Sequence, residues 1–247
     1  MTLEEAMYKF YDGLETLGPG SEETTIRLFE LIPSSSGSIN AIDIGCGTGR
    51  SSMVLAKHGV KVTAVDDYQP FLDSLDEKAK KEGLAEQIYT LNLSMDQLKL
   101  PSNSFDLVWS EASVYVLGFE KALQTWKKLL KPNGYMVVTE CCWTSDSPSK
   151  EVSDFWSEEY PGMFTVTEAQ RIAEKTGFEV FDTHTLPESD WENYYKPQNK
   201  RITELEEGAG PEMEQVIEHT RKEIAIRDKY NSDYEYVAFI LRLPQKI

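Results

Sequence analysis

The chain has 247 residues, of which 40% are hydrophobic and 27% are charged, which is typical of a globular protein with a sizeable core. Its 42 acidic and 25 basic side chains give a net charge of −17. Such a charge repels nucleic-acid backbones and anionic lipid, so we expect neither a nucleic acid nor a membrane as a partner.

The cysteines and the first residues indicate the compartment. Cys46, Cys141 and Cys142 are odd in number and two of them are adjacent, so no disulfide framework is expected. The start MTLEEAMYKF is acidic where a signal peptide is basic, and no apolar run approaches the length of a membrane span. We therefore expect a soluble, cytoplasmic protein.

In chain order, residues 1–38 are expected to form a helical segment that is interrupted at LGPGS. Ser21 is a good N-cap for a helix through EETTIRLFELI, and the loop LIPSSSGS ends this segment. Residues 39–142 alternate between strand and helix patterns, which predicts a parallel sheet with helices on both faces. The strands are expected at 39–44, 61–66, 87–93, 104–111 and 135–143, and the helices at 49–58, 69–83 and 119–134.

After residue 143 the alternation is lost. Residues 143–164 are polar and aromatic without a clear period, which indicates a loop with a short helix. Residues 187–230 contain no strand pattern and are therefore predicted to be an insertion before the last strand. The remaining expected elements are a helix over 165–177, a strand over 178–186, a helix over 211–230 and a final strand over 234–243.

The most informative stretch is INAIDIGCGTGRSS, in which a strand pattern leads into the spacing D-x-G-x-G-x-G from Asp43 to Gly49. A dinucleotide-binding turn has G-x-G-x-x-G, but here Arg50 stands at the third glycine position and is too large for close helix–strand packing. A P-loop requires a lysine after its glycines, and none follows. The pattern instead suits a ligand with a cationic amino group, because Asp43 enters the turn and the glycines let the backbone approach a flat ligand.

Asp66 ends the second predicted strand, 23 residues after Asp43. An acid at about this spacing can accept hydrogen bonds from the ribose hydroxyls of a nucleoside ligand. Nicotinamide-dependent and S-adenosylmethionine-dependent proteins share this role, so Asp66 alone does not separate the two classes.

Together, DIGCGTG, VTAVD and LPSNSFDLVWSE resemble the class I S-adenosylmethionine-dependent methyltransferases, especially the small-molecule group that includes quinone-biosynthesis methyltransferases. The flanks LGPGSEET and ECCW also resemble a bacterial and archaeal subgroup of this family. The resemblance implies an α/β, Rossmann-like, doubly wound and mainly parallel seven-stranded sheet with an antiparallel last strand. Residues 1–247 would then be a single methyltransferase domain, with a helical cap (1–38), a cofactor-binding core (39–142) and an insertion or lid (187–230).

By this resemblance the cofactor is S-adenosyl-L-methionine, with S-adenosyl-L-homocysteine as its product. Gly45 and Gly47 are expected to line the methionine part, Asp66 to hold the ribose, and Tyr68 is a candidate to stack on adenine. The family commonly has an acid beside adenine, but residues 94–96 read Ser-Met-Asp, so the serine hydroxyl, the methionine backbone or the aspartate would hold the base. The expected cofactor-binding residues are Asp43, Gly45, Cys46, Gly47, Gly49, Asp66, Asp67, Ser94, Met95, Asp96 and Glu111.

Methyl transfer from a sulfonium requires alignment and desolvation, and a general base only where the acceptor must lose a proton. Glu111 and Tyr115 follow the fourth predicted strand, whose carboxyl end faces the ligand crevice, and are the expected catalytic residues. A homodimer could use an exposed aromatic insertion, and the widely separated histidines predict no metal site. The aromatic residues expected to enclose a small-molecule acceptor are Tyr8, Tyr11, Trp143, Trp191, Tyr194 and Tyr195.

Two other functions stay open at this point. An NAD(P)-dependent oxidoreductase would share the sheet and Asp66, although Arg50 replaces its third glycine. A non-catalytic S-adenosylmethionine-binding module would act through partners and would lack an open acceptor pocket. Thiolate binding of arsenite is disfavoured, because Cys141 and Cys142 are adjacent in a predicted strand and should point to opposite faces.

Overall fold

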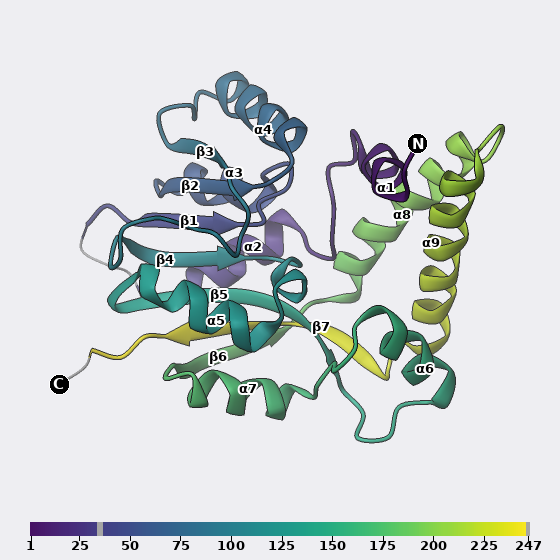
Figure 1. The fold of residues 1–247 in the computed structure, drawn as a ribbon. Helices are drawn as coiled ribbons and strands as arrows, with labels where there is room; N and C mark the ends of the chain where they lie inside the picture. The colour runs from purple at the N-terminus through teal and green to yellow at the C-terminus, as the bar shows by residue number, and fades with distance from the viewer. Residues whose placement is uncertain (34–36, 246–247) are drawn as a thin grey trace.

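A seven-stranded sheet forms the centre of the computed structural model, which describes residues 1–33 and 37–245 (Figure 1). The strands are β1 (Asn40–Ile44), β2 (Lys61–Asp66), β3 (Ile88–Asn92), β4 (Phe105–Ser110), β5 (Leu130–Trp143), β6 (Glu179–Thr185) and β7 (Tyr234–Arg242). Their order in the sheet is β3-β2-β1-β4-β5-β7-β6. The first five are parallel, and β7 runs antiparallel to both β5 and β6. The predicted Rossmann-like fold is confirmed.

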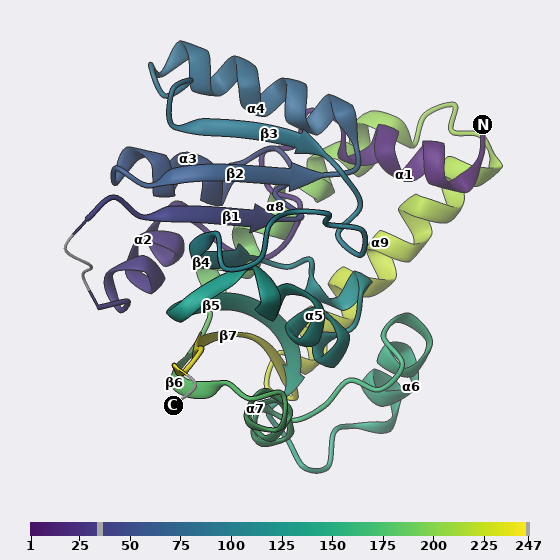
Figure 2. The same ribbon diagram turned by 60° about the vertical axis from the view of Figure 1, so that its left-hand side comes forward.

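Helices cover both faces of this sheet because apolar residues of the strands point alternately to either side. In β1, Ala41 packs into one core and Ile42 into the other. Cys141 and Cys142 are likewise divided between the two cores, as their adjacency in a strand predicts. The helices over the first core are α2 (Glu22–Glu30), α3 (Arg50–Lys57) and α4 (Gln69–Lys81), and those over the second are α5 (Phe119–Trp126) and α7 (Val166–Lys175) (Figure 2).

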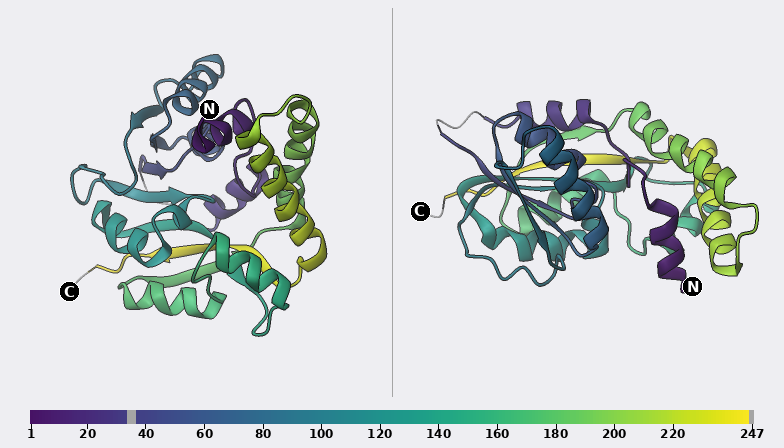
Figure 3. Two further views of the ribbon diagram at one scale, coloured as in Figure 1. Left: turned by 45° about the vertical axis from the view of Figure 1, so that its right-hand side comes forward. Right: turned by 90° about the horizontal axis from the view of Figure 1, so that it is seen from above.

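Four more helices gather beyond the carboxyl ends of the parallel strands (Figures 1 and 3). They are α1 (Leu3–Tyr11), α6 (Lys150–Glu159), α8 (Glu188–Leu205) and α9 (Pro211–Tyr230). α1 packs against α8 and α9 in a separate apolar cluster that contains Phe10, Ile202 and Val216. The beginning of the chain and its late part therefore cover the same edge of the sheet together. The division into segments 1–38, 39–142 and 187–230 stays a prediction.

The sequence did not predict α8, although it is 18 residues long. Pro197 lies inside this helix, and a proline interrupts the local pattern that identifies a helix because it lacks an N–H donor. The helix is stabilised by tertiary packing, since it buries Trp191, Tyr194, Tyr195 and Ile202.

The prediction of a helix over residues 119–134 is wrong in its second half. α5 ends at Trp126, a 3-10 turn covers Lys127–Leu129, and β5 begins at Leu130, so Pro132 lies within a strand. The β4–β5 ladder shifts its register after the pair Leu130–Phe105, and such an irregularity accommodates a proline that cannot donate a ladder hydrogen bond.

The N-terminal segment has the predicted break. Ser21 caps α2, since its Oγ accepts a hydrogen bond from the backbone N–H of Thr24 at 3.1 Å. The loop predicted for LIPSSSGS falls partly on residues 34–36, which lie outside the described residues. Within the described part of the chain, no helix combines the length and the apolar character needed to cross a lipid bilayer.

Candidate active site

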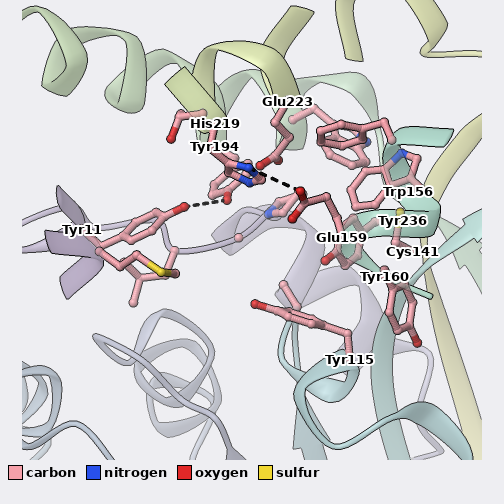
Figure 4. Close-up of a pocket in the computed structure, with 18 of the residues that line it drawn as sticks. Tyr11, Tyr115, Cys141, Trp156, Glu159, Tyr160, Tyr194, His219, Glu223 and Tyr236 are labelled. Atoms are coloured by element: carbon pink, nitrogen blue, oxygen red, sulfur yellow. Dashed lines mark hydrogen bonds and ion pairs between the residues drawn. The ribbon is translucent and has the colours of Figure 1, made fainter. Parts of the chain in front are cut away.

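Two neighbouring cavities lie at the carboxyl edge of the parallel strands. The turn cavity, of about 360 Å³, is lined by the glycine turn after β1 together with the ends of β2 and β4. The cap cavity, of about 480 Å³, lies between the sheet edge and helices α1, α6, α8 and α9 (Figure 4). Leu17, Gly18, Ala112 and Tyr115 line both cavities. A ligand in one cavity is therefore adjacent to a ligand in the other.

The glycine turn brings its bare backbone to the surface of the turn cavity. Gly45 and Gly47 have φ angles of +70° and +52°, which L side chains rarely adopt. A Cβ atom on Gly45 would lie 2.5 Å from Oγ of Ser113, and one on Gly47 would lie 2.7 Å from Cδ1 of Leu17. Any side chain at either position would intrude on the wall of the cavity, so the turn is built for a ligand that touches the backbone.

Asp66 ends β2 and lies directly beside this turn. Its Oδ2 accepts from the backbone N–H of Gly47 at 2.9 Å, and its Oδ1 accepts from that of Tyr68 at 3.0 Å. Burial raises the pKa of Asp66, and these two backbone hydrogen bonds oppose that shift. A carboxylate has about four acceptor positions, so two remain for the hydroxyls of a ligand.

Asp43 lies at the base of the turn and is almost completely buried, with 1% of its surface exposed. Its Oδ2 accepts a hydrogen bond of 2.6 Å from Oγ of Ser52. Burial raises the pKa of Asp43 to about 7, and the Ser52 hydrogen bond partly offsets this effect. A cationic group nearby would favour the ionised form of Asp43. The backbone cradle, the acceptor positions of Asp66 and the acid beneath the turn fit S-adenosylmethionine.

Most of the expected cofactor residues line the turn cavity. Gly49 and Asp96 do not: Gly49 packs against Leu75 of α4, and Asp96 accepts a 2.8 Å hydrogen bond from Oγ of Ser94. Residues that the sequence did not assign also line it, including Phe71 and Ser113. The expected residues that line it are Asp43, Gly45, Cys46, Gly47, Asp66, Asp67, Ser94, Met95 and Glu111.

Tyr68 is not among the lining residues. Its ring stacks on the ring of Tyr8 from α1, with centroids 3.9 Å apart and planes at 9°. Tyr8 itself lines the turn cavity, so α1 extends over this site as well as over the cap cavity. The aromatic residues that line the turn cavity are therefore Tyr8, Phe71 and Tyr115.

The carboxylate of Glu111 is engaged with three neighbouring side chains. Its Oε2 lies 2.9 Å from Nη2 of Arg50, and its Oε1 accepts from Nε1 of Trp109 at 2.8 Å and from Oγ1 of Thr25 at 2.7 Å. Only 4% of the Glu111 side chain is exposed. Glu111 thus connects α2, α3 and β4 at the rim of the turn cavity. Its expected catalytic role stays a prediction.

The cap cavity contains part of the expected aromatic set. Tyr11, Trp191 and Tyr194 of that set line it, whereas Trp143 and Tyr195 do not. Tyr115, which was expected to be catalytic, lines it as well. Figure 4 shows the hydroxyl of Tyr11 pointing toward the hydroxyl of Tyr194, and the two oxygens lie 3.3 Å apart, within hydrogen-bond distance. The residues that line it and were not expected include Phe155, Trp156 and Tyr160, all from α6 and the residue that follows it.

Three acids also line the cap cavity and were missed by the sequence analysis: Glu140, Glu159 and Glu223. Glu140 has 0% of its surface exposed, and burial raises its pKa to about 8. Its Oε1 accepts from the N–H of Cys141 at 2.9 Å and its Oε2 from the hydroxyl of Tyr160 at 3.2 Å. The signal was present in the sequence, because an acid in the apolar run YMVVTECCW stands near the carboxyl end of a parallel strand, as Glu111 does.

The sequence and the fold are similar to those of known methyltransferases. Residues 42–138 match the family described as Methyltransferase domain. The chain is 31% identical over 128 residues to the ribosomal protein arginine N-methyltransferase rmt3 of Schizosaccharomyces pombe. It is 27% identical over 173 residues to the O-methyltransferase resE of Aspergillus sclerotiorum. These alignments cover 48% and 68% of this chain but 24% and 65% of the relatives, so the chain spans less than two thirds of either.

A solved structure shares almost the whole fold. It is the S-adenosylmethionine-dependent methyltransferase from Geobacter sulfurreducens in complex with S-adenosyl-L-homocysteine. The two structures superimpose with a TM-score of 0.82 at 16% identity, covering 96% of this chain and 97% of the other.

Proposed function

The chain belongs to the class I S-adenosylmethionine-dependent methyltransferases, and from this premise we propose that it transfers a methyl group to a small-molecule acceptor held in the cap cavity. The observation that carries the proposal is the wall shared by the two cavities, formed by Leu17, Gly18, Ala112 and Tyr115. This wall lets a cofactor in the turn cavity and an acceptor in the cap cavity meet while each keeps its own binding surface.

The turn cavity supplies binding and orientation. We assign the ribose hydroxyls to Asp66 and the methionine part to the backbone of Gly45 and Gly47, with Asp43 beneath the turn favouring a cationic amino group. When bound, S-adenosylmethionine supplies a methyl group on a positively charged sulfur, which is a good leaving group. The protein then needs chiefly to align the acceptor and to exclude water.

The cap performs these two tasks. α1, α6 and α8 line the acceptor cavity with aromatic rings and α9 closes its remaining side, which leaves little room for water beside a bound acceptor. Tyr115 borders both cavities, so its ring is placed to orient the acceptor toward the cofactor. We propose Tyr115 as the residue that aligns the acceptor.

Glu111 and Glu140 are assigned different roles. Glu111 is held by Arg50, Trp109 and Thr25, so we propose that it positions the glycine turn against β4 and does not act as a base. Glu140 lines the acceptor cavity, and a carboxylate with a pKa of about 8 is suited to take a proton near neutral pH. Glu140 is therefore the proposed base for an acceptor that must lose a proton.

Isothermal titration with S-adenosyl-L-homocysteine tests the cofactor site. We expect micromolar binding to the wild type and at least about tenfold weaker binding, or 1.4 kcal/mol, to Asp66→Ala. NADH should not bind; NADH binding without S-adenosyl-L-homocysteine binding would favour an oxidoreductase. A protein that binds S-adenosyl-L-homocysteine but methylates no acceptor from a panel of amines, phenols and thiols would favour a non-catalytic module. Homodimer formation and the absence of nucleic-acid partners stay proposals.

A further inference from the structure

We propose that the cap cavity binds an organic cation, an amine on an apolar or aromatic body, as its methyl acceptor. This inference rests on the proposed methyltransferase function and names the acceptor class for the same site. It follows from three features of the cavity wall: the sign of its charged groups, the absence of counter-charges for its buried carboxylates, and its aromatic rings.

The charged side chains of the cap cavity are predominantly acidic. Glu140, Glu159 and Glu223 line it, whereas no Lys or Arg occurs among the lining residues that the structure describes. Nδ1 of His219 lies 3.5 Å from Oε1 of Glu159, so this histidine already has an acidic neighbour (Figure 4). A phosphate or carboxylate acceptor would find no Lys or Arg side chain to pair with in the described wall, and the imidazole of His219 already lies beside Glu159.

Among the described residues, two of the carboxylates have no ion-pair partner, although the charge of a protonated His219 would partly offset the burial of Glu223. Glu140 accepts only from a backbone N–H and from Tyr160, and Glu223 accepts from the hydroxyl of Tyr195 at 2.9 Å. Across residues 1–33 and 37–245, no ion pair involves either acid. Burial raises the pKa of both carboxyl groups. A buried carboxylate is costly to ionise without a counter-charge, and a bound cation would supply that counter-charge.

Aromatic rings lie next to these acids. The hydroxyl of Tyr160 donates to Glu140, and the ring of Tyr160 meets that of Tyr115 edge to face with centroids 6.3 Å apart. Cations bind favourably over the faces of Trp and Tyr rings. The fold already uses this interaction on Trp191, another lining residue, where the guanidinium carbon of Arg227 lies 4.1 Å from the ring centroid. A cavity of about 480 Å³ is large enough to hold the body of such an amine as well as its charged group.

Transfer to an amine balances in atoms and electrons. The nitrogen lone pair forms the new N–C bond, the C–S bond of the donor breaks, and the electron pair of that bond stays on sulfur. An ammonium must lose one proton before its nitrogen can attack, and the ionised carboxylate of Glu140 can accept that proton. The cation that pairs with Glu140 on binding is thus also the source of the proton that Glu140 removes.

The test is isothermal titration of the protein saturated with S-adenosyl-L-homocysteine. The probes are benzyltrimethylammonium, benzyl alcohol and benzoate, which share a ring and differ in charge. We expect the cation to bind at least about tenfold more tightly than the alcohol, and benzoate to bind no more tightly than the alcohol. Because benzyltrimethylammonium carries no acidic proton, any proton released on binding must come from the protein. Titration at pH 7 in buffers of different ionisation enthalpy should show such a release.

Three variants identify the groups involved. Glu140→Gln should abolish the proton release, and Glu140→Gln and Glu223→Gln should each weaken binding of the cation about fivefold or more. Glu158→Gln is the matched control, since Glu158 is an exposed acid of α6 outside the cavity lining, and it should leave the affinity within about twofold.

Equal or weaker binding of the cation relative to the alcohol, tighter binding of benzoate, or no binding of the cation at millimolar concentration would overturn the inference. The comparison of the three probes on the wild type needs no variant, so a variant that fails to fold does not affect it. Binding of S-adenosyl-L-homocysteine is measured separately. If S-adenosyl-L-homocysteine binds but the cation is not preferred, only the proposed class of acceptor is rejected. If S-adenosyl-L-homocysteine does not bind, the proposed methyltransferase function is rejected.

Discussion

The guanidinium of Arg50 and the carboxylate of Glu111 form a largely buried ion pair, with Nη2 2.9 Å from Oε2. Arg50 is the first residue of α3 and stands where a dinucleotide-binding turn has its third glycine. Its Nη1 also donates to the carbonyl oxygen of Gly18 at 3.3 Å. Arg50 therefore distinguishes this turn from a nicotinamide-binding turn. Its side chain also connects α3 to Glu111 at the end of β4 and to Gly18, which lines both cavities.

Arg50→Met should destabilise the protein by about 3 kcal/mol, because it leaves the Glu111 carboxylate buried without its counter-charge. Chemical denaturation monitored by circular dichroism measures this change. Lys131→Met is the control, since Lys131 pairs with Asp106 at 2.9 Å on the surface with 38% of its side chain exposed. An exposed pair contributes less than about 1 kcal/mol. Similar losses for both variants would contradict the assigned role of the Arg50–Glu111 pair.

Gly45→Ala should weaken binding of S-adenosyl-L-homocysteine at least about tenfold, because the new methyl group combines a left-handed backbone conformation with a contact to Ser113. Gly83→Ala is a matched control: Gly83 has a φ of +73°, close to the +70° of Gly45, but a Cβ there would meet nothing within 4 Å. Both variants carry a backbone penalty of about 1 kcal/mol, visible in thermal denaturation. Only Gly45→Ala should lose affinity in calorimetry, and an equal effect of both would show that backbone strain alone is responsible.

The core of the fold could be predicted because its signals are local. Alternating apolar residues in short strands and a glycine-rich turn identify β1 and α3 from a few neighbouring positions. The residues that we propose for the cofactor, Gly45, Gly47 and Asp66, follow from the same local pattern. The end of α5 could not be predicted, since the register shift beside Pro132 depends on a neighbouring strand.

The proposed acceptor site was harder to predict because the walls of the cap cavity come from distant parts of the chain. Phe10 of α1 packs with Val216 of α9, and Tyr8 stacks on Tyr68, pairings that no local spacing reveals. Glu111 was recognised as an acid at a strand end, but its partner Arg50 was considered only as a replaced glycine. Glu140 was not predicted, although the same argument applies to it, because it stands inside the apolar run YMVVTECCW, which predicts a strand and not a site.

Tyr115 gives a test of how the two cavities cooperate. Tyr115→Phe should keep activity within about threefold of wild type, because phenylalanine keeps the ring of the one aromatic side chain that lines both cavities in the described part of the chain. Tyr115→Ala should lower kcat about tenfold or more by loosening the alignment of acceptor and cofactor. Affinity for S-adenosyl-L-homocysteine should change little in either variant. A loss in Tyr115→Phe as large as in Tyr115→Ala would instead assign the hydroxyl a direct chemical role.

Because Glu140 is protonated in the folded protein, its contribution to the free energy of unfolding should fall as the pH rises from about 5 to about 8. Its pKa is about 8 in the folded protein and near 4.5 for an ordinary glutamate, so within this window the folded state binds more protons than the unfolded state. Proton binding by the folded state means that the free energy of unfolding falls with pH, by up to about 1.4 kcal/mol per pH unit for one such group. Burial raises the pKa values of the Tyr and Cys side chains on which the charge of Glu140 acts, so none of these side chains titrates in this window. They are Tyr115, Tyr160, Tyr236, Cys141 and Cys142.

Glu140→Gln isolates this contribution, since glutamine keeps the size of the side chain and the effects of Asp43 and Glu223, whose pKa values are also raised by burial, are present in both proteins. The difference between the wild-type and Glu140→Gln unfolding free energies, from denaturant titrations at half-unit pH steps, should slope downward across the window and flatten above about pH 8. Saturation with benzyltrimethylammonium should lower the midpoint of that slope, because a bound cation favours ionised Glu140. Parallel curves for the two proteins would mean that folding does not raise the pKa of Glu140, which would contradict its proposed role as a base that titrates near neutral pH.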